Sequence, residues 1–137
     1  MIIEESIDIH VAPDAIMRCY RDVAAWPEWD PDTRAASIDG PFAVGNSGTL
    51  RPTKGMAVSM RLTSVSAHGF TVVSRVPLCT MRFDHDLIPI AGGTRVTHRV
   101  SFDGMLAGLF GRVVGAGVRR GLPVTLARLK ARLEAQR

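Results

Sequence analysis

A stripe of residues near the C-terminus constrains the fold of this chain more than any other feature. Its members are spaced three and four apart, as on one face of an α-helix, and they change from glycine to leucine along the chain: Gly104, Gly108, Gly111, Gly115, Val118, Leu122, Leu126, Leu129 and Leu133. With Gly117 and Gly121, which lie off the stripe, the segment contains six glycines, and in a helix these cost roughly 5 kcal/mol relative to alanine, comparable with the net stability of a small domain. We therefore expect either that another backbone packs very close to this face or that the glycines keep space open for a ligand.

The rest of the chain is predicted to contain strands and two short helical segments. Apolar and polar residues alternate over 3–11, as in a strand. Residues 13–22 begin with a proline and an aspartate, which is typical of the first turn of a helix. The proline-rich residues 26–31 are typical of a short helical turn. Six further strands are predicted at residues 34–39, 47–52, 56–66, 69–76, 79–88 and 94–103. The sequence thus predicts an α+β fold, in one domain of residues 1–137, whose antiparallel sheet is covered by the last helix. Pro123 lies inside that helix, and we predict a kink or break between Arg120 and Leu122.

The strands at 79–88 and 94–103 predict a hairpin that brings two histidines together. A turn between Ala91 and Gly92 places His85 opposite His98 on the apolar face, and the charged residues on the other face. A slip of one residue would pair apolar with charged side chains, so the register is well specified. We expect both imidazoles to be neutral at pH 7, because burial and their proximity disfavour the cation.

The inward positions of the predicted strands give a set of cavity-lining residues. The set comprises Met56, Val58, Met60, Phe70, Met81, Phe83, His85, His98, Val100 and Phe102, together with Gly108, Gly111 and Gly115 of the helix and Trp29, which we expect to close one end. Met60 and its neighbours are also ordinary core residues, and Trp29 would equally anchor the helical turn to the sheet. The two histidines are the candidate catalytic residues; the alternative is that each one hydrogen-bonds within the core.

Several segments resemble the START/Bet v 1-like (SRPBCC) superfamily, in its polyketide cyclase/dehydrase-like branch. They are Ile9-His10-Val11-Ala12-Pro13-Asp14, Trp26-Pro27-Glu28-Trp29-Asp30-Pro31, Phe83-Asp84-His85-Asp86-Leu87, Gly93-Thr94-Arg95-Val96-Thr97, and Gly104 through Leu122-Pro123. The resemblance implies a helix-grip fold, in which a curved seven-stranded antiparallel sheet wraps around a long C-terminal helix and encloses a hydrophobic cavity. The superfamily includes lipid carriers, aromatase/cyclases and protein-binding modules, and it has no invariant catalytic set to transfer.

Composition excludes several other classes of protein. Cys19 and Cys79 lie far apart without zinc-ligand spacing, so we expect no metal, no cofactor and a reducing, cytoplasmic compartment. The N-terminus lacks the pattern of a signal peptide, and residues 104–118 are too few to span a bilayer. The net charge of +4 arises in the last helix, whose cations Arg128, Lys130, Arg132 and Arg137 avoid the leucines. We interpret them as a solvated face, with anionic lipid as the alternative and no nucleic-acid partner, since aromatic interleaving is absent.

Three functions remain open at this point. The first is binding of a small hydrophobic ligand, which would be lipid-like, aromatic or polyketide-like. The second is a polyketide cyclase/dehydratase-type enzyme, in which one of His85 and His98 removes a proton while the other polarises an oxygen. The third is an interaction module, including a homodimer, that uses apolar residues off the glycine stripe: Leu106, Leu109, Phe110, Val113 and Val114.

Overall fold

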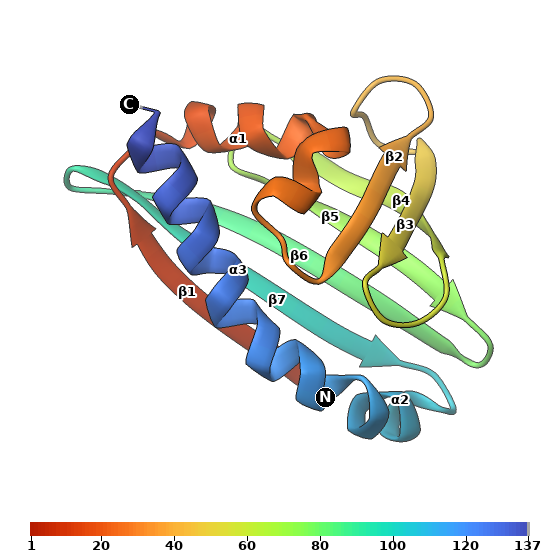
Figure 1. Ribbon diagram of the computed structural model, residues 1–137. Helices are drawn as coiled ribbons and strands as arrows, with labels where there is room; N and C mark the ends of the chain where they lie inside the picture. The colour runs from red at the N-terminus through yellow and green to blue at the C-terminus, as the bar shows by residue number, and fades with distance from the viewer. Residues whose placement is uncertain (137) are drawn as a thin grey trace.

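The computed structural model describes residues 1–136 and contains one sheet with a helical layer on its concave face. The elements are β1 (Ile2–Ile9), α1 (Pro13–Arg21), η1 (Val23–Glu28), β2 (Thr33–Ile38), β3 (Ser47–Pro52), β4 (Val58–Ser66), β5 (Gly69–Val76), β6 (Cys79–Ile90), β7 (Gly93–Asp103), α2 (Ala107–Val113) and α3 (Gly115–Ala135). The seven strands are antiparallel neighbours in the order β1-β7-β6-β5-β4-β3-β2. Helix α3 lies across the curved sheet over β1 and β7 (Figure 1). The predicted α+β helix-grip fold is confirmed.

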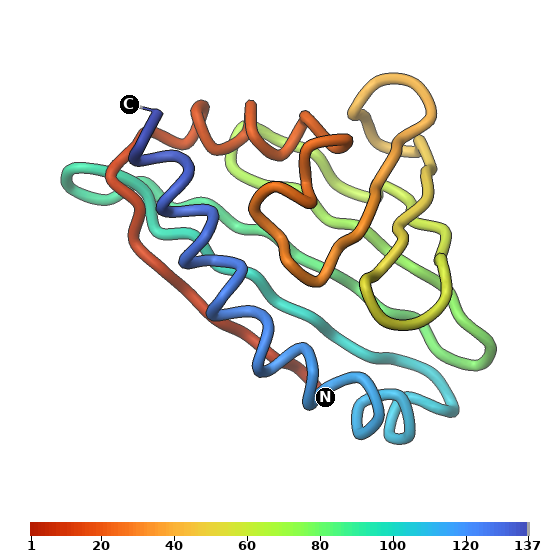
Figure 2. The backbone as a smooth tube through the Cα atoms, in the orientation of Figure 1, coloured from red at the N-terminus to blue at the C-terminus, as the bar shows by residue number. Residues whose placement is uncertain are grey.

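The path of the backbone places the two ends of α3 in different surroundings. Figure 2 shows the C-terminal end beside α1, and the N-terminus of the chain beside the start of α3 and α2. A large apolar core lies at the first end, where the buried residues Leu126, Leu129 and Leu133 pack with Tyr20 and Trp26. A smaller cluster lies at the other end, where α2 covers Phe102 and its neighbours. The leucine half of the stripe is therefore core, as the spacing predicts.

The β6–β7 hairpin has the predicted register. Met81 pairs with Phe102, Phe83 with Val100, and His85 with His98. On the outer face Asp84 lies opposite Arg99, and the guanidinium Nη1 of Arg99 is 3.6 Å from a carboxylate oxygen of Asp84. Cross-strand pairs of this kind fix which face of each strand is buried. The position of both histidines on the concave face follows directly from this register.

The break in the last helical segment lies earlier than predicted. The helix does not begin at Gly104, because the φ angle of +113° at that residue is not helical, and α2 ends where Val114 makes a turn before α3. Helix α3 continues without interruption through Pro123, so the predicted break between Arg120 and Leu122 is wrong. Pro123 and Arg119, four residues before it, are both exposed, so water can satisfy the carbonyl group that the proline leaves without a donor.

The glycine half of the stripe has more than one structural cause. A Cβ atom at Gly111 would lie 2.8 Å from Met1 Sδ, and one at Gly115 would lie 3.4 Å from Ile3 Cδ1, so at these positions β1 packs closely on the helices. Gly108 is exposed and a Cβ there would meet nothing within 4 Å. Close packing thus explains Gly111 and Gly115, though through side chains rather than backbone, and Gly108 lies outside the interior.

One inward residue was assigned to the wrong segment. Met56 is 85% exposed, because β4 begins at Val58 and Met56 remains in the preceding loop. Its predicted place in the cavity wall is therefore wrong. Met60 and Leu62 are buried on the concave face as the alternation predicts.

The glycine contacts predict opposite effects of two alanine substitutions. Gly117→Ala adds a methyl group where nothing lies within 4 Å, and should stabilise the protein by up to about 1 kcal/mol through helix propensity. Gly48→Ala would place a Cβ against the backbone carbonyl of Ser37, and should destabilise it by about 2–4 kcal/mol. Urea unfolding measures both changes, and a stabilised Gly48→Ala variant would show that the β2–β3 contact is misplaced.

Candidate ligand-binding site

The two histidines form the centre of an aromatic cluster on the concave face of the sheet. The ring centroids of His85 and His98 are 4.6 Å apart with the rings nearly perpendicular. Phe70 of the neighbouring strand β5 stacks on His85, with centroids 3.9 Å apart and planes within 5°. Tyr20 from α1 reaches the pair from the other side, 5.5 Å from His85 and 5.9 Å from His98 between centroids. The sequence predicted the histidine pair but not the tyrosine.

Hydrogen bonds determine which nitrogen of His85 is free. His85 Nδ1–H donates to the backbone oxygen of Phe70 over 3.2 Å, and since a carbonyl only accepts, the proton is on Nδ1. Nε2 of His85 is then the acceptor nitrogen of the neutral ring. His98 Nε2 is hydrogen-bonded to the hydroxyl of Tyr20 over 2.8 Å. His85 therefore keeps an acceptor nitrogen that Phe70 does not engage, while His98 Nε2 is engaged by Tyr20.

Both imidazoles are neutral at pH 7, in agreement with the prediction. Burial lowers the pKa of His85 to about 4, and hydrogen bonding to Phe70 only partly opposes that shift. Burial also lowers the pKa of His98 well below its usual value, and the proximity of His85 adds to the effect. Desolvation raises the pKa of Tyr20, which keeps its hydroxyl protonated. The cluster therefore contains polar groups but carries no charge.

The carboxylates of the hairpin point to the outer face, as predicted. Asp84 accepts hydrogen bonds from Thr71 Oγ1 over 2.6 Å and from Arg82 Nε over 3.0 Å. Asp86 forms an ion pair with Arg99, with 3.1 Å between Asp86 Oδ2 and Arg99 Nη1. On the neighbouring strand Glu5 lies opposite His98, but its side chain is exposed. No hydrogen bond between a carboxylate and either imidazole is found within residues 1–136.

Two buried side-chain polar atoms have no hydrogen-bond partner among the described residues. They are Nε1 of Trp29, which follows η1, and Oγ of Ser74 on β5. Trp29 is 3% exposed and its ring lies 5.9 Å from Tyr20 and 6.4 Å from His98. A buried group left unpaired costs about 1–3 kcal/mol, so a partner supplied by a ligand would be favourable. The sequence placed Trp29 here but missed Ser74, although the alternation of β5 puts it on the inner face with Phe70 and Val72.

The predicted lining residues divide into two groups by burial. Met60, Phe70, Val100 and Phe102 are fully buried, whereas Val58, Met81 and Phe83 keep partial exposure on the concave face. Val118 and Leu122 of α3 pack against the smaller core cluster, which contains Val100 and Phe102, and they are also partly exposed. Partly exposed apolar side chains are therefore present on both the sheet and α3. Phe83 packs against both apolar clusters and so lies between them.

A separate surface groove lies at the other end of α3. It has a volume of about 590 Å³ and is bounded by α1 and the C-terminal end of α3, with Asp14, Arg18 and Arg132 among its lining residues. None of the predicted site residues contributes to it. Its mixed charges and openness to solvent distinguish it from the apolar surroundings of the histidines.

Comparisons with solved structures agree with this architecture. The fold is similar to that of Ara h 8.0201, with 13% identity, a TM-score of 0.76 and 98% of each chain covered. It is similar to the ZhuI aromatase/cyclase from Streptomyces sp. R1128, with 14% identity, a TM-score of 0.79, and 98% of this chain and 93% of that one covered. It is also similar to protein MLL2253 from Mesorhizobium loti, with 16% identity, a TM-score of 0.78 and coverage of 99% and 98%. These identities establish a shared fold only.

The curved sheet gripping a C-terminal helix defines a protein of the Bet v 1-like (SRPBCC) superfamily. Residues 1–134 match one family within it, and the chain belongs to that family, described as polyketide cyclase / dehydrase and lipid transport. A search of curated proteins finds no significant match in sequence. Family and fold together support a hydrophobic ligand-binding or polyketide cyclase-type role. No helix within residues 1–136 is long and apolar enough to cross a membrane.

The lowered histidine pKa values predict a specific dependence of stability on pH. In the unfolded chain His85 binds a proton below about pH 6.5, whereas in the folded protein it does so only near pH 4. The folded state should therefore lose stability as the pH falls from about 6.5 to 4, by roughly 2–3 kcal/mol for His85, with His98 adding to the loss. Urea unfolding at several pH values measures this slope.

The variant His85→Phe should have a shallower slope between pH 6.5 and 4 than the wild type, because it lacks the titrating group while keeping a ring against Phe70. His68→Gln is the matched control, since His68 is exposed. Parallel curves for wild type and His85→Phe would contradict the assignment of His85 as a buried neutral group.

Proposed function

We propose that this protein binds a small hydrophobic molecule of aromatic or polyketide-like character in the space between the sheet and α3. The observation that carries the proposal is a pair of buried polar atoms without partners among the described residues, Trp29 Nε1 and Ser74 Oγ, in a largely apolar core that also contains the neutral His85. Binding sites for small molecules are mostly apolar with a few polar groups that fix orientation. The interior has this character.

The chemistry of these atoms defines what the ligand must offer. His85 Nε2 accepts a hydrogen bond, so it suits a phenol or alcohol hydroxyl. The indole N–H of Trp29 only donates, so it suits a carbonyl or phenolic oxygen. Since the cluster carries no charge, an ionised ligand would enter without a counter-ion and is disfavoured. The preferred ligand is therefore a neutral ring system with a hydroxyl and a carbonyl group.

Acid/base catalysis by the histidine pair receives less support. A general base works best when its pKa is close to the operating pH, and that of His85 is about 4. The nitrogen of His98 that faces Tyr20 is already hydrogen-bonded, and no carboxylate orients either ring among the described residues. Of the two roles that the family supports, binding fits the geometry better than proton abstraction.

Native mass spectrometry of the purified protein tests the proposal most directly, because a retained ligand would be released and identified. Titration with 6-acetyl-2-naphthol, followed by tryptophan fluorescence, supplies a defined probe with a ring system, a phenol and a ketone. We expect 2-acetylnaphthalene, which lacks the phenol, to bind more weakly. Failure of both compounds to bind, with no retained molecule, would contradict the proposal.

The two tryptophans provide a matched pair of variants. Trp29→Phe removes an N–H that has no protein partner, and should weaken binding of 6-acetyl-2-naphthol about five- to tenfold with little effect on folding. Trp26→Phe removes an N–H that donates to the backbone oxygen of Tyr20 over 2.9 Å, and should reduce stability while leaving the affinity nearly unchanged. Equal affinities for the two variants would show that Trp29 does not contact the probe. Each variant lacks one of the two tryptophans, so its fluorescence signal differs from that of the wild type. Isothermal titration calorimetry, which does not depend on fluorescence, therefore measures these affinities.

A further inference from the structure

The outer face of α2 is apolar although it faces solvent. Met105, just before the helix, is 86% exposed, and Leu109 and Val113 are 56% and 72% exposed. Their spacing of four places them on one side of the helical segment. The other side is also apolar, because Ala107, Phe110 and Val114 pack against the smaller core cluster. Of the five residues that the sequence hypothesis assigned to an apolar surface, Leu109 and Val113 are exposed, whereas Leu106, Phe110 and Val114 are partly buried.

Neighbouring segments extend this apolar surface. Leu78 in the turn between β5 and β6 is 59% exposed, and its carbonyl accepts a hydrogen bond from Leu106 N over 2.9 Å, so the turn lies beside α2. Leu78 is the one non-glycine among the described residues with a positive φ, at 58°, a conformation that leucine rarely adopts. Met1 is 53% exposed and its sulfur lies beside Gly111 of α2. We call the exposed residues Met1, Leu78, Met105, Leu109 and Val113 the apolar tip.

The charges near the apolar tip are mostly positive. Arg112 on α2 and Arg119 and Arg120 in the first turns of α3 are exposed, and none of the three forms an ion pair with another residue of 1–136. Between residues 104 and 133 the sequence contains no acidic residue; Asp103, just before that segment, is exposed. Nearer the C-terminus Lys130 pairs with Glu134 and Arg132 with Glu28, whereas Arg128 is exposed and forms no ion pair with another residue of 1–136. Three of the four arginines that form no ion pair within residues 104–136 therefore lie on α2 and the first part of α3, toward the apolar tip.

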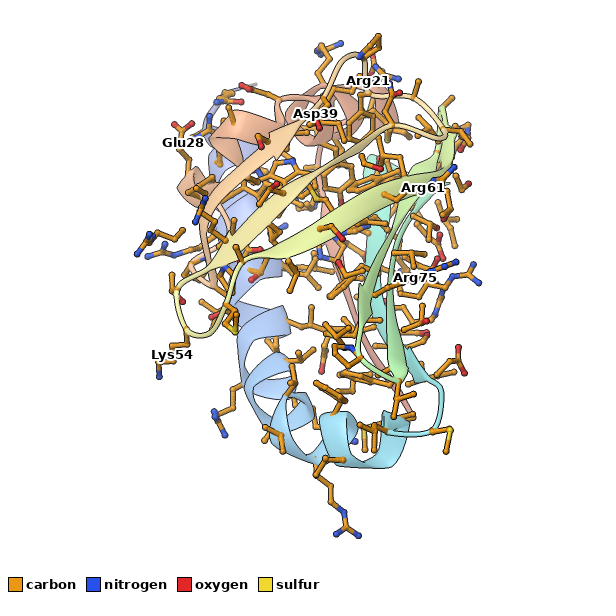
Figure 3. The ribbon with its side chains drawn as sticks, turned by 90° about the vertical axis from the view of Figure 1, so that its right-hand side faces the viewer. Arg21, Glu28, Asp39, Lys54, Arg61 and Arg75 are labelled. Carbon is orange, nitrogen blue, oxygen red and sulfur yellow. The ribbon has the colours of Figure 1, made fainter. Side chains whose placement is uncertain are left out.

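We propose that the apolar tip docks on an anionic membrane surface. Apolar side chains flanked by arginines are the combination that enters the interface of a bilayer, where the first insert among acyl chains and the second bind lipid phosphates. The tip forms a projecting end of the molecule, with α2 and the β5–β6 turn together at the bottom of Figure 3, which suits insertion better than a flat contact. Complementarity between unpaired arginines and anionic headgroups favours lipid over a second copy of this chain, which would bring like charges together. The proposal does not depend on the ligand site.

Vesicle cosedimentation tests the proposal. The wild type should bind vesicles of 70% phosphatidylcholine and 30% phosphatidylglycerol, bind pure phosphatidylcholine at least tenfold more weakly, and lose binding in high salt. The triple variant Met105→Ser/Leu109→Ser/Val113→Ser should bind at least tenfold more weakly than the wild type. Its control is Val44→Ser/Ile88→Ser/Val124→Ser, which alters three other exposed apolar residues and should bind normally.

The arginines are tested with two double variants that have the same net charge as each other. Arg119→Gln/Arg120→Gln should weaken binding to the anionic vesicles by about fivefold for each arginine. Arg21→Gln/Arg61→Gln, which removes two exposed cations far from α2 in Figure 3, should have a much smaller effect.

Three results would overturn the proposal. They are absence of vesicle binding, equal binding to neutral and anionic vesicles, and equal loss in tip and control variants. A dimer that sedimentation equilibrium detects and that the triple tip variant abolishes, without vesicle binding, would assign the surface to a second copy instead. Trp29→Phe should leave vesicle binding unchanged, so failure of either proposal is distinguishable from failure of the other.

Discussion

The register of β6 against β7 is the constraint on which the interior of this protein depends. It places His85 beside His98 and, by the same pairing, holds Asp84 and Asp86 on the opposite face, where Arg82 and Arg99 neutralise them. A shift of one residue would bring two carboxylates into the apolar core and expose Phe83 and Val100. The neutral character of the aromatic cluster is thus a consequence of strand pairing, and helix α1 completes it by supplying Tyr20.

Local periodicity was sufficient to predict much of this arrangement. The order of the strands along the chain, the hairpin register and the burial of Leu126, Leu129 and Leu133 all follow from residue spacing, because alternation and helical repeats record which face is covered. The features that were missed depend on contacts between distant segments. The hydrogen bond between Tyr20 and His98 joins residues 78 positions apart, and the packing of Met1 on Gly111 joins the first residue of the sequence to α2. Such contacts leave no periodic signal.

The prediction of a break before Pro123 was wrong for a related physical reason. Proline removes one backbone donor from a helix and its ring crowds the carbonyl four residues earlier; both effects are better tolerated where that carbonyl can tilt outward and bind water. Whether a helical position is wet depends on the sheet that it packs against, so the sequence of the helix alone does not decide the outcome. The glycines illustrate the same point, since Gly111 lies against Met1 whereas Gly108 faces solvent.

The aromatic cluster also gives the molecule an optical property. Trp26 and Trp29 are the only tryptophans in the sequence, their rings lie 6.2 Å apart, and both belong to the cluster around Tyr20. Indole emission responds to the polarity of its surroundings, and all of the indole emission of this protein originates within one small volume next to the histidines. The intrinsic fluorescence spectrum is therefore a local report on the interior and not an average over the molecule, so an event at the surface that leaves the cluster undisturbed would leave the spectrum unchanged.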